Sequence, residues 1–461
     1  MYRPFDHERS AAGTRALWAI AIVLIASVAV ALALPQTMPR RFPDRKPIHV
    51  WHPWTAEWKT IVDRIVATYN ASQDRYEVIA LSVPAHTAAS KFLSSVAGGA
   101  PPDVIVSWDA VIPKWAEGGI IMPLDGLMSA EERERVTRSA YPISLKIGTY
   151  KSRLYAIVTG LDVYACYLRT DFAREAGLDA ERPPETLDNL VAWGEKLDRF
   201  DSNKRLVRAG FLDPLSSVLG LAMFAPAFGG GFYDWDRGVL TLNTPENLRA
   251  LSFLAGTRER LGFENVVRFE SGHSGDVANA AWPFITGAYG ITIDGQWRVE
   301  QIAQYAPDLA YDTFPIPPPV GGRAHAGWAS GNFAMIAKGA KNVEGAWEFI
   351  RFWSGIDNPD RAAEFYTWGG WLPPFPDLAE APAYREYVEK NPRFKAFLDV
   401  LPSEYLQPMP PVSHQAYLWD RIAAAYAAAM RGTLRPDAAL ARITLENERE
   451  VAMHKELGYT E

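Results

Sequence analysis

Cysteine is almost absent from this chain of 461 residues, which contains only Cys166. A single cysteine can form no intrachain disulfide and no cysteine-rich metal site. The eight histidines are scattered and show no pair at the spacing of metal ligands on a helix. We therefore expect neither a bound metal nor a cofactor.

Recognisable catalytic motifs are also missing from the sequence. It contains no serine elbow, no HExxH, no P-loop and no GxGxxG. The formal net charge is −7, which would repel a polyanion, so nucleic acid is not an expected partner. Hydrophobic residues make up 48% and charged residues 22%, which is typical of a globular protein, and the length suits two or three domains.

The N-terminus contains an uncharged segment, residues 16–34, which follows Arg3, Arg9 and Arg15. A basic start followed by an apolar run is typical of a signal peptide, and this run is also just long enough to span a bilayer. We expect an N-terminal hydrophobic helix, either cleaved or kept as a membrane anchor, and a proline-rich tether up to residue 47. The body of the protein should then lie in the periplasm. No cysteine stands directly after the run, so a lipid-modified cysteine is excluded.

From residue 48 onward, short apolar runs alternate with helical ones. The order of strand, helix and strand indicates βαβ units, and hence an α/β fold with a mostly parallel sheet. Thr186 and Thr244 are expected to cap two of the helices. The predicted strands are 48–51, 76–83, 103–108, 153–160, 163–170, 289–295 and 332–338. The predicted helices include 56–70, 87–97, 110–119, 183–200, 243–262, 342–353, 414–431 and 436–454.

Tryptophan is abundant, with 16 residues, and several stand where a predicted strand ends. Trp54 follows the first strand, Trp108 and Asp109 end the third, and Trp297 comes soon after Asp294. Ligands of open α/β sheets bind outside the carboxyl ends of the strands. An indole ring beside a carboxylate suits a carbohydrate, because the ring covers the C–H face of the sugar while the carboxylate accepts hydrogen bonds from its hydroxyls. These residues therefore predict a carbohydrate-binding cleft.

Other aromatic residues allow two interpretations. Trp58 lies on the apolar stripe of its helix and is expected in the core. Trp328, Ser330 and Trp371 are close to glycines, as exposed loop residues often are. Core packing is the alternative for each cleft tryptophan, and helix capping is the alternative for Asp109.

Four segments resemble the extracellular solute-binding proteins of bacterial ABC importers, in the maltose-binding-protein-like sugar-binding family. In chain order they are 92–125, which contains "GGAPPDV", 183–197, 287–302, which contains "GITIDGQW", and 332–355. The resemblance implies a two-lobed periplasmic-binding-protein fold, type II-like, in which each lobe is a mostly parallel sheet flanked by helices. It places lobe 1 at 48–157 and 320–356 and lobe 2 at 158–319 and 357–461, with one crossing near 314–322.

The resemblance also implies a ligand cleft between the lobes, and it points to Trp297, Trp108 and Asp109. Trp54 and Trp108 are expected to act from one lobe, and Trp297 and Trp371 from the other. Asp162 and Tyr164 fall where the chain is expected to cross between lobes. The full set of candidate binding residues is Trp54, Trp108, Asp109, Asp162, Tyr164, Asp294, Trp297, Trp328, Ser330 and Trp371.

The expected function is that of a substrate-binding component of an ABC importer. A monomer would capture a sugar or an oligosaccharide and deliver it to permease subunits in the membrane. One alternative is a secreted carbohydrate-active enzyme, for which two carboxylates would suffice. Another is a carbohydrate-binding sensor that needs no permease.

Overall fold

The computed structural model describes residue 18 and residues 40–213, 219–273 and 280–456. The chain divides into two compact units, Met1–Lys46 and Pro47–Glu461, and the second contains all features discussed below. None of the helices in these described ranges is both long and apolar enough to cross a bilayer. The predicted hydrophobic helix at 16–34 lies outside the described residues apart from Trp18.

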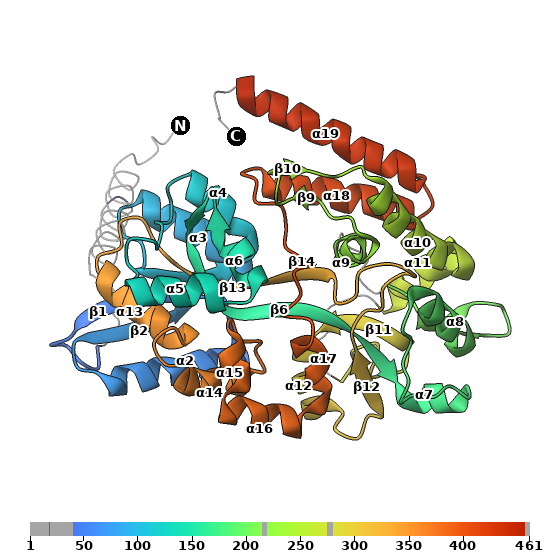
Figure 1. Cartoon of the computed structure of the whole chain (residues 1–461), viewed down its shortest axis with the longest axis horizontal. Coiled ribbons are helices and arrows are strands. Elements are labelled where there is room, and N and C mark those ends of the chain that lie inside the picture. Colours follow the sequence, from blue (N-terminus) through green and yellow to red (C-terminus); the bar gives the residue numbers. More distant parts are fainter. Residues whose placement is uncertain (1–17, 19–39, 214–218, 274–279, 457–461) are drawn as a thin grey trace, which may run out of the picture. The chain divides into compact units, whose positions relative to one another are not determined.

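A ten-stranded sheet runs through the described part of the second unit (Figure 1). Its main path is β2 (Tyr76–Ser82), β1 (Lys46–His52), β3 (Val104–Trp108), β13 (Gly327–Ile336), β6 (Ala156–Arg169), β11 (Tyr289–Gly295), β8 (Leu206–Phe211) and β7 (Arg199–Phe200). Two further strands extend it, β12 (Tyr311–Phe314) beside β6 and β14 (Leu406–Gln407) beside β13.

The strand directions make this sheet mixed, whereas the sequence predicted mostly parallel sheets. Strand β1 is parallel to β3, and β8 is parallel to β11. Strand β13 is antiparallel to both β3 and β6, and β6 is antiparallel to β11 and β12. The βαβ pattern describes only neighbours along the chain, and these antiparallel pairs join segments that are far apart in sequence.

Strands β6 and β13 carry the sheet from the β1–β3 side to the β11–β8 side. The sequence predicted two strands over 153–170, but β6 is one continuous strand of 14 residues. It pairs with β13 from Ala329↔Val163 to Met335↔Ala156. The proline-rich segment 314–322 stays near α8 and the segment after α9, since Leu187 N donates to Pro318 O and Arg323 N donates to Ala227 O.

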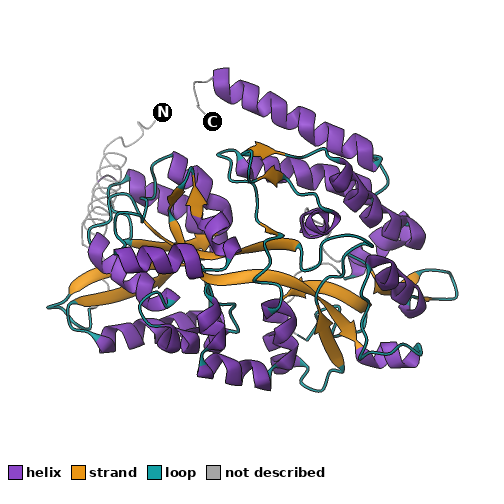
Figure 2. Cartoon of the chain, viewed as in Figure 1, coloured by secondary structure: helices purple, strands orange, loops and turns teal. Residues whose placement is uncertain are grey.

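Helices cover both faces of the sheet (Figure 2). The predicted N-caps are confirmed, because Thr186 Oγ1 accepts from Asn189 N at 3.2 Å and Thr244 Oγ1 accepts from Asn247 N at 3.2 Å. The longer helices are α2 (Ala56–Ser72), α3 (Ala85–Ala97), α5 (Ala130–Ser139), α8 (Leu187–Leu197), α10 (Pro245–Leu261), α11 (Phe263–Gly272), α12 (Trp297–Tyr305), α13 (Val343–Ser354), α14 (Pro359–Gly369), α16 (Pro382–Lys390), α18 (Gln415–Met430) and α19 (Pro436–Glu456).

Shorter elements complete the unit. They are α4 (Ile112–Glu117), α6 (Pro142–Gly148), α7 (Thr170–Glu175), α9 (Leu219–Phe224), α15 (Pro376–Glu380), α17 (Lys395–Leu398), the 3₁₀ turns η1 (Asp109–Val111), η2 (Ala225–Phe228) and η3 (Pro392–Phe394), and the strands β4 (Thr149–Tyr150), β5 (Arg153–Leu154), β9 (Tyr233–Asp234) and β10 (Val239–Leu240).

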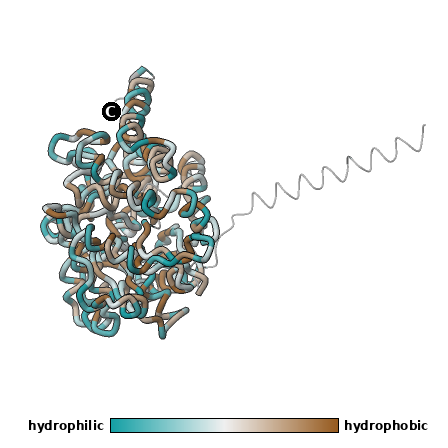
Figure 3. The backbone as a smooth tube through the Cα atoms, turned by 90° about the vertical axis from the view of Figure 1, so that its right-hand side faces the viewer, coloured by the Kyte–Doolittle hydropathy of each residue, from teal (hydrophilic) through white to brown (hydrophobic). Residues whose placement is uncertain are grey.

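Two clusters of buried apolar side chains stabilise the sheet. One includes Val50, Val106 and Phe333 from β1, β3 and β13, together with Trp353 of α13. The other includes Ile291 of β11, Leu254 of α10 and Tyr426 of α18. In Figure 3 much of the hydrophilic colour lies on the outer loops of this unit. The packing of these clusters on the sheet fixes the positions of the side chains at the strand ends.

Candidate functional site

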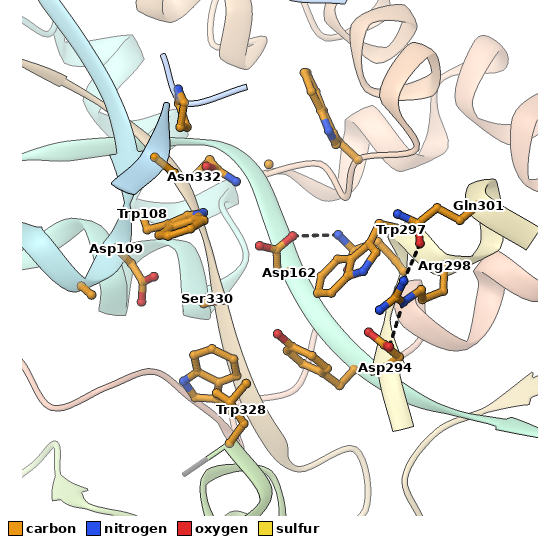
Figure 4. A pocket seen from close by; sticks show the side chains of 18 of the residues that line it. Trp108, Asp109, Asp162, Asp294, Trp297, Arg298, Gln301, Trp328, Ser330 and Asn332 are labelled. Atoms are coloured by element: carbon orange, nitrogen blue, oxygen red, sulfur yellow. Dashed lines mark hydrogen bonds and ion pairs between the residues drawn. The ribbon is translucent and has the colours of Figure 1, made fainter. Parts of the chain in front are cut away.

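A cavity of about 1000 Å³ lies among β3, β6, β11, β13 and the helices beside them. All ten candidate binding residues line this cavity, although they come from stretches spread over more than 300 positions of the chain. Seven of the ten are labelled in Figure 4. Their part in binding stays a prediction, but the structure brings them to a single site. The ten are Trp54, Trp108, Asp109, Asp162, Tyr164, Asp294, Trp297, Trp328, Ser330 and Trp371.

Two neighbouring strands form the floor of the cavity. Successive side chains of a strand point to opposite faces, so residues two apart share a face. In the β13–β6 register, Ser330 pairs with Asp162 and Asn332 pairs with Gly160. Six lining residues follow this alternation, namely Trp328, Ser330 and Asn332 on β13 and Gly160, Asp162 and Tyr164 on β6.

A first aromatic group surrounds Tyr164. Its ring stacks on Trp328, with centroids 5.4 Å apart and planes at 28°. The ring of Trp297 meets Tyr164 edge-on at 5.7 Å. The ring centroids of Trp328 and of Trp419, which belongs to α18, are 5.8 Å apart. These four rings are only half-buried, so part of each ring remains open to a ligand in the cavity.

Gly295 positions Trp297 in this group. Trp297 is the first residue of α12, directly after β11 and the turn at Gln296. A Cβ atom at Gly295 would lie 2.1 Å from Cζ3 of Trp297. The indole ring therefore lies over the glycine, and any larger residue there would displace it.

A second aromatic group lies around Trp54. The ring of Trp54 stacks on Trp371 at 5.1 Å and 27° and is 5.8 Å from Trp353. The expectation that Trp371 acts from the wall opposite Trp54 is therefore wrong. Trp371 follows α14, which packs against α2 and α13, and this packing brings it to the Trp54 side.

Trp58 was predicted to be a core residue, but it is half-buried and lines the cavity. It lies in the first turn of α2, where the helix begins beside the cavity. Trp108, at the end of β3, is the most open of the tryptophans on the wall, with 55% of its surface exposed. Trp58 also packs partly against the core, and both rings contribute to the cavity wall.

Two carboxyl groups face the cavity without a cationic partner among the described residues. Asp109 is buried and accepts hydrogen bonds from the backbone of Ala110 and Gly331. Burial, with a contribution from the nearby Asp162, raises the pKa of Asp109 to about 7. Burial also raises the pKa of Asp162 to about 6, although its Oδ1 accepts from Gln296 Nε2 at 2.8 Å.

The third candidate carboxylate, Asp294, is already engaged. Its Oδ2 accepts from Arg298 Nε at 2.8 Å, and its Oδ1 accepts from Gly295 N at 2.8 Å. Arg298 also donates to Gln301 Oε1 at 2.7 Å and lies 4.5 Å from the Trp282 ring centroid. These contacts favour a role for Asp294 in fixing the start of α12 rather than in direct contact with a ligand.

Other residues on the wall were not among the ten candidates. Asn332 is buried, and its Oδ1 has no partner among the described residues; the same holds for Nε1 of Trp328. Asn332 follows Ser330 by two positions, so the alternation of a strand could have identified it. Gln301 and Trp419 lie on helices whose orientation the sequence does not specify.

Metal binding finds no support in the part of the chain that the structure describes. No group of three or more His, Cys, Asp or Glu side chains in these ranges could hold a metal ion. The chemistry that the wall does offer is aromatic stacking combined with hydrogen-bond acceptors.

Comparisons with known proteins bear on the family and the fold. A family model described as bacterial extracellular solute-binding protein matches residues 64–396. The maltotriose-binding protein of Pyrococcus abyssi is 22% identical over 365 residues, which cover 78% of this chain and 73% of that protein. The sn-glycerol-3-phosphate-binding periplasmic protein UgpB of Salmonella typhimurium is 24% identical over 361 residues, covering 75% and 78%. The structure of CpMnBP1 with mannotriose bound is 25% identical, with a TM-score of 0.74, covering 87% of this chain and 100% of that one.

Proposed function

We propose that this chain, which belongs to the family of bacterial extracellular solute-binding proteins, captures a sugar or an oligosaccharide in its aromatic-lined cavity. The observation that carries this proposal is the wall itself, which holds eight of the 16 tryptophans together with Tyr164 and Tyr289. Indole rings pack on the C–H faces of sugar rings, and polar groups between them bind hydroxyls. The volume of about 1000 Å³ is at the upper end for small-molecule sites, which favours an oligosaccharide over a single sugar ring.

Capture would occur by closure of two lobes around the ligand. In this proposal the lobes are 48–157 with 320–356 and 158–319 with 357–461, as the resemblance implied, except that α14 and Trp371 join the first lobe, because α14 packs against α2 and α13 and Trp371 stacks on Trp54. We place the crossing segments in β6 and β13, since these strands connect the two sides of the sheet. Ligand must bind the closed form more tightly than the open form, so contacts are needed from Trp54 and Trp108 on one side and Trp297 on the other.

Delivery would be to permease subunits of an ABC importer in the cytoplasmic membrane. The protein would act as a monomer in the periplasm, either released from its N-terminal segment or tethered by it. The family description and the periplasmic relative support this location. ATP would be hydrolysed by the transporter and not by this chain.

The bound sugar would leave chemically unchanged. An enzyme remains the alternative to test, because Asp109 and Asp162 provide two carboxyl groups in one cavity. Chromatographic analysis of an oligosaccharide after hours with the protein should show no products. Turnover that disappears in Asp109→Asn or Asp162→Asn would replace the binding function with a catalytic one.

Binding itself is tested by calorimetric titration of the purified chain with maltotriose, mannotriose, cellotriose and tri-glucosamine. At least one should bind with one-to-one stoichiometry and change the tryptophan fluorescence. Trp108→Ala should weaken that binding at least tenfold, while Tyr305→Ala, an exposed aromatic outside the cavity, should not. Absence of binding for every member of the panel would contradict the proposed function.

A further inference from the structure

We infer that the captured sugar carries a protonated amine and that its ammonium group lies against Asp109 and Asp162. The ligand would then be an amino sugar or an oligosaccharide of amino sugars. This inference rests on the proposed function, because it specifies the ligand of the same cavity.

The charges on the cavity wall favour a cationic ligand. Among the described residues that line the cavity, one arginine and one histidine face five acidic side chains, namely Arg298, His273, Asp109, Asp162, Glu270, Asp294 and Asp420. Arg298 is ion-paired with Asp294 at 2.8 Å, and Glu270 is ion-paired with Arg258 at 2.6 Å. Within the described residues, Asp109 and Asp162 therefore have no cation. The undescribed stretches 214–218 and 274–279 contain no lysine or arginine in the sequence.

The hydrogen-bonding groups around the two carboxyl groups favour a ligand group with several donors. Asp109, Asp162 and the Oδ1 of Asn332 are acceptors, and the Asn332 oxygen has no donor among the described residues. A buried acceptor without a donor costs about 1–3 kcal/mol. An ammonium group has three donors and no acceptor, whereas a hydroxyl group has a single donor. The ammonium group matches this set of acceptors better than a sugar hydroxyl does.

The sheet brings the three acceptors together. Asn332 pairs with Gly160 on one side and with Trp108, the neighbour of Asp109, on the other. Ser330, two residues before Asn332, pairs with Asp162. Adjacent strands lie about 4.8 Å apart, so Asn332 on β13, Asp162 on β6 and Asp109, which directly follows β3, occupy neighbouring positions. In Figure 4 these side chains lie around one part of the cavity, together with the ring of Trp108.

The burial of Asp109 and Asp162 also favours a cation beside them. Burial raises the pKa of Asp109 to about 7 and that of Asp162 to about 6, which means that their charged forms are unfavourable without a cation beside them. A ligand cation would restore both charged forms, and its hydrogen bonds to them would be charge-assisted. The exposed face of Trp108 would add a cation–π contact. An anionic ligand such as a phosphate would meet repulsion from the same groups.

A matched set of trisaccharides tests this inference near neutral pH. Cellotriose, tri-glucosamine and tri-N-acetylglucosamine share one linkage and differ only in the substituent at carbon two, which is a hydroxyl, an ammonium or an amide. Calorimetry should show tri-glucosamine binding at least tenfold more tightly than the other two and than maltotriose or mannotriose. Asp162→Asn and Asp109→Asn should each remove most of this preference, while Asp308→Asn, an exposed carboxylate outside the cavity, should preserve it.

The outcomes separate this inference from the proposed function. A neutral trisaccharide that binds as tightly as tri-glucosamine would contradict the inference of an amine-bearing ligand, while sugar capture would still stand. A preference that survives both asparagine variants would also overturn it. No binding by any of these trisaccharides would contradict the proposed function and the amine together. Chemical denaturation of each variant verifies that a lost preference does not come from lost folding.

Discussion

Trp297 differs from the buried tryptophans of this protein because its ring packs against Gly295 and Tyr164 on the cavity wall and not inside the hydrophobic core. Trp297→Ala should therefore lower sugar affinity at least tenfold, which is about 1.4 kcal/mol, in a calorimetric titration. The free energy of unfolding without ligand should fall by much less than the roughly 3–5 kcal/mol expected for a core tryptophan.

Trp353 provides the matched control, since it is 1% exposed and belongs to the core. Trp353→Ala should cause a large loss of stability in chemical denaturation. If Trp297→Ala behaves like Trp353→Ala and leaves affinity unchanged, Trp297 is a core residue.

Asp109 should make the stability of the ligand-free protein depend on pH. Burial raises its pKa from 3.8 to about 7, so between these values the folded state holds a proton that the unfolded state releases. The free energy of unfolding should therefore fall as pH rises through this window. Asp109→Asn should be more stable than the parent above pH 7, by about 1–3 kcal/mol, with the difference shrinking toward pH 4. Denaturant titrations at several pH values measure this, and a difference independent of pH would contradict it.

The sequence identified those site residues that stand at the end of a recognisable apolar strand. Trp108, Asp109 and Trp297 directly follow apolar runs, so their place at the sheet edge could be inferred locally. Asn332 and Trp419 could not be placed in the same way. One depends on the register between β13 and β6, and the other on the rotation of α18 against Trp328, and both are set by long-range packing.

Among the elements, β13 depends on a glycine at its closest approach to β6. A Cβ atom at Gly331 would lie 2.5 Å from the carbonyl oxygen of Gly160. Gly331→Ala should push the strands apart and reduce the free energy of unfolding by about 1–3 kcal/mol in chemical denaturation. It should also weaken sugar binding, because Ser330 and Asn332 lie on either side of the substitution.

Gly256 is the control for the same chemical change. It lies within α10, and apart from the adjacent backbone of its own helix no described atom comes within 4 Å of the position that its Cβ atom would occupy. Gly256→Ala should raise stability by about 0.5–1 kcal/mol through helix propensity, without effect on binding. Equal effects of the two substitutions would show that the β13–β6 contact is not tight.

The helices were the most predictable elements because their signals are local. Apolar residues three and four apart marked α2, and the caps at Thr186 and Thr244 marked α8 and α10. The direction in which two strands pair, by contrast, is not encoded by a local signal. Nothing near residues 156–169 or 327–336 in the sequence states that these segments pair with each other in opposite directions. The mixed sheet and the unbroken β6 therefore appeared only in the structure.

For the whole molecule, ligand should both stabilise and compact the chain. A sugar at 100 times its dissociation constant should add about 2.7 kcal/mol to the free energy of unfolding, which thermal or chemical denaturation can measure. If β6 and β13 act as the crossing segments, small-angle X-ray scattering should show a smaller radius of gyration with ligand than without it. Stabilisation at constant radius would mean that the cavity binds without closure.

The pairing of β3 with β13 also constrains the order in which the chain can fold. Trp108 pairs with Asn332, so β3 cannot pair with β13, its second neighbour, until more than 200 further residues have been synthesised. Contacts of such long sequence separation slow folding, because the loop must close before the contact contributes. A growing chain therefore carries β1 to β3 as an incomplete sheet with one edge unpaired until residue 336 has been made, and the cavity is among the last features to form.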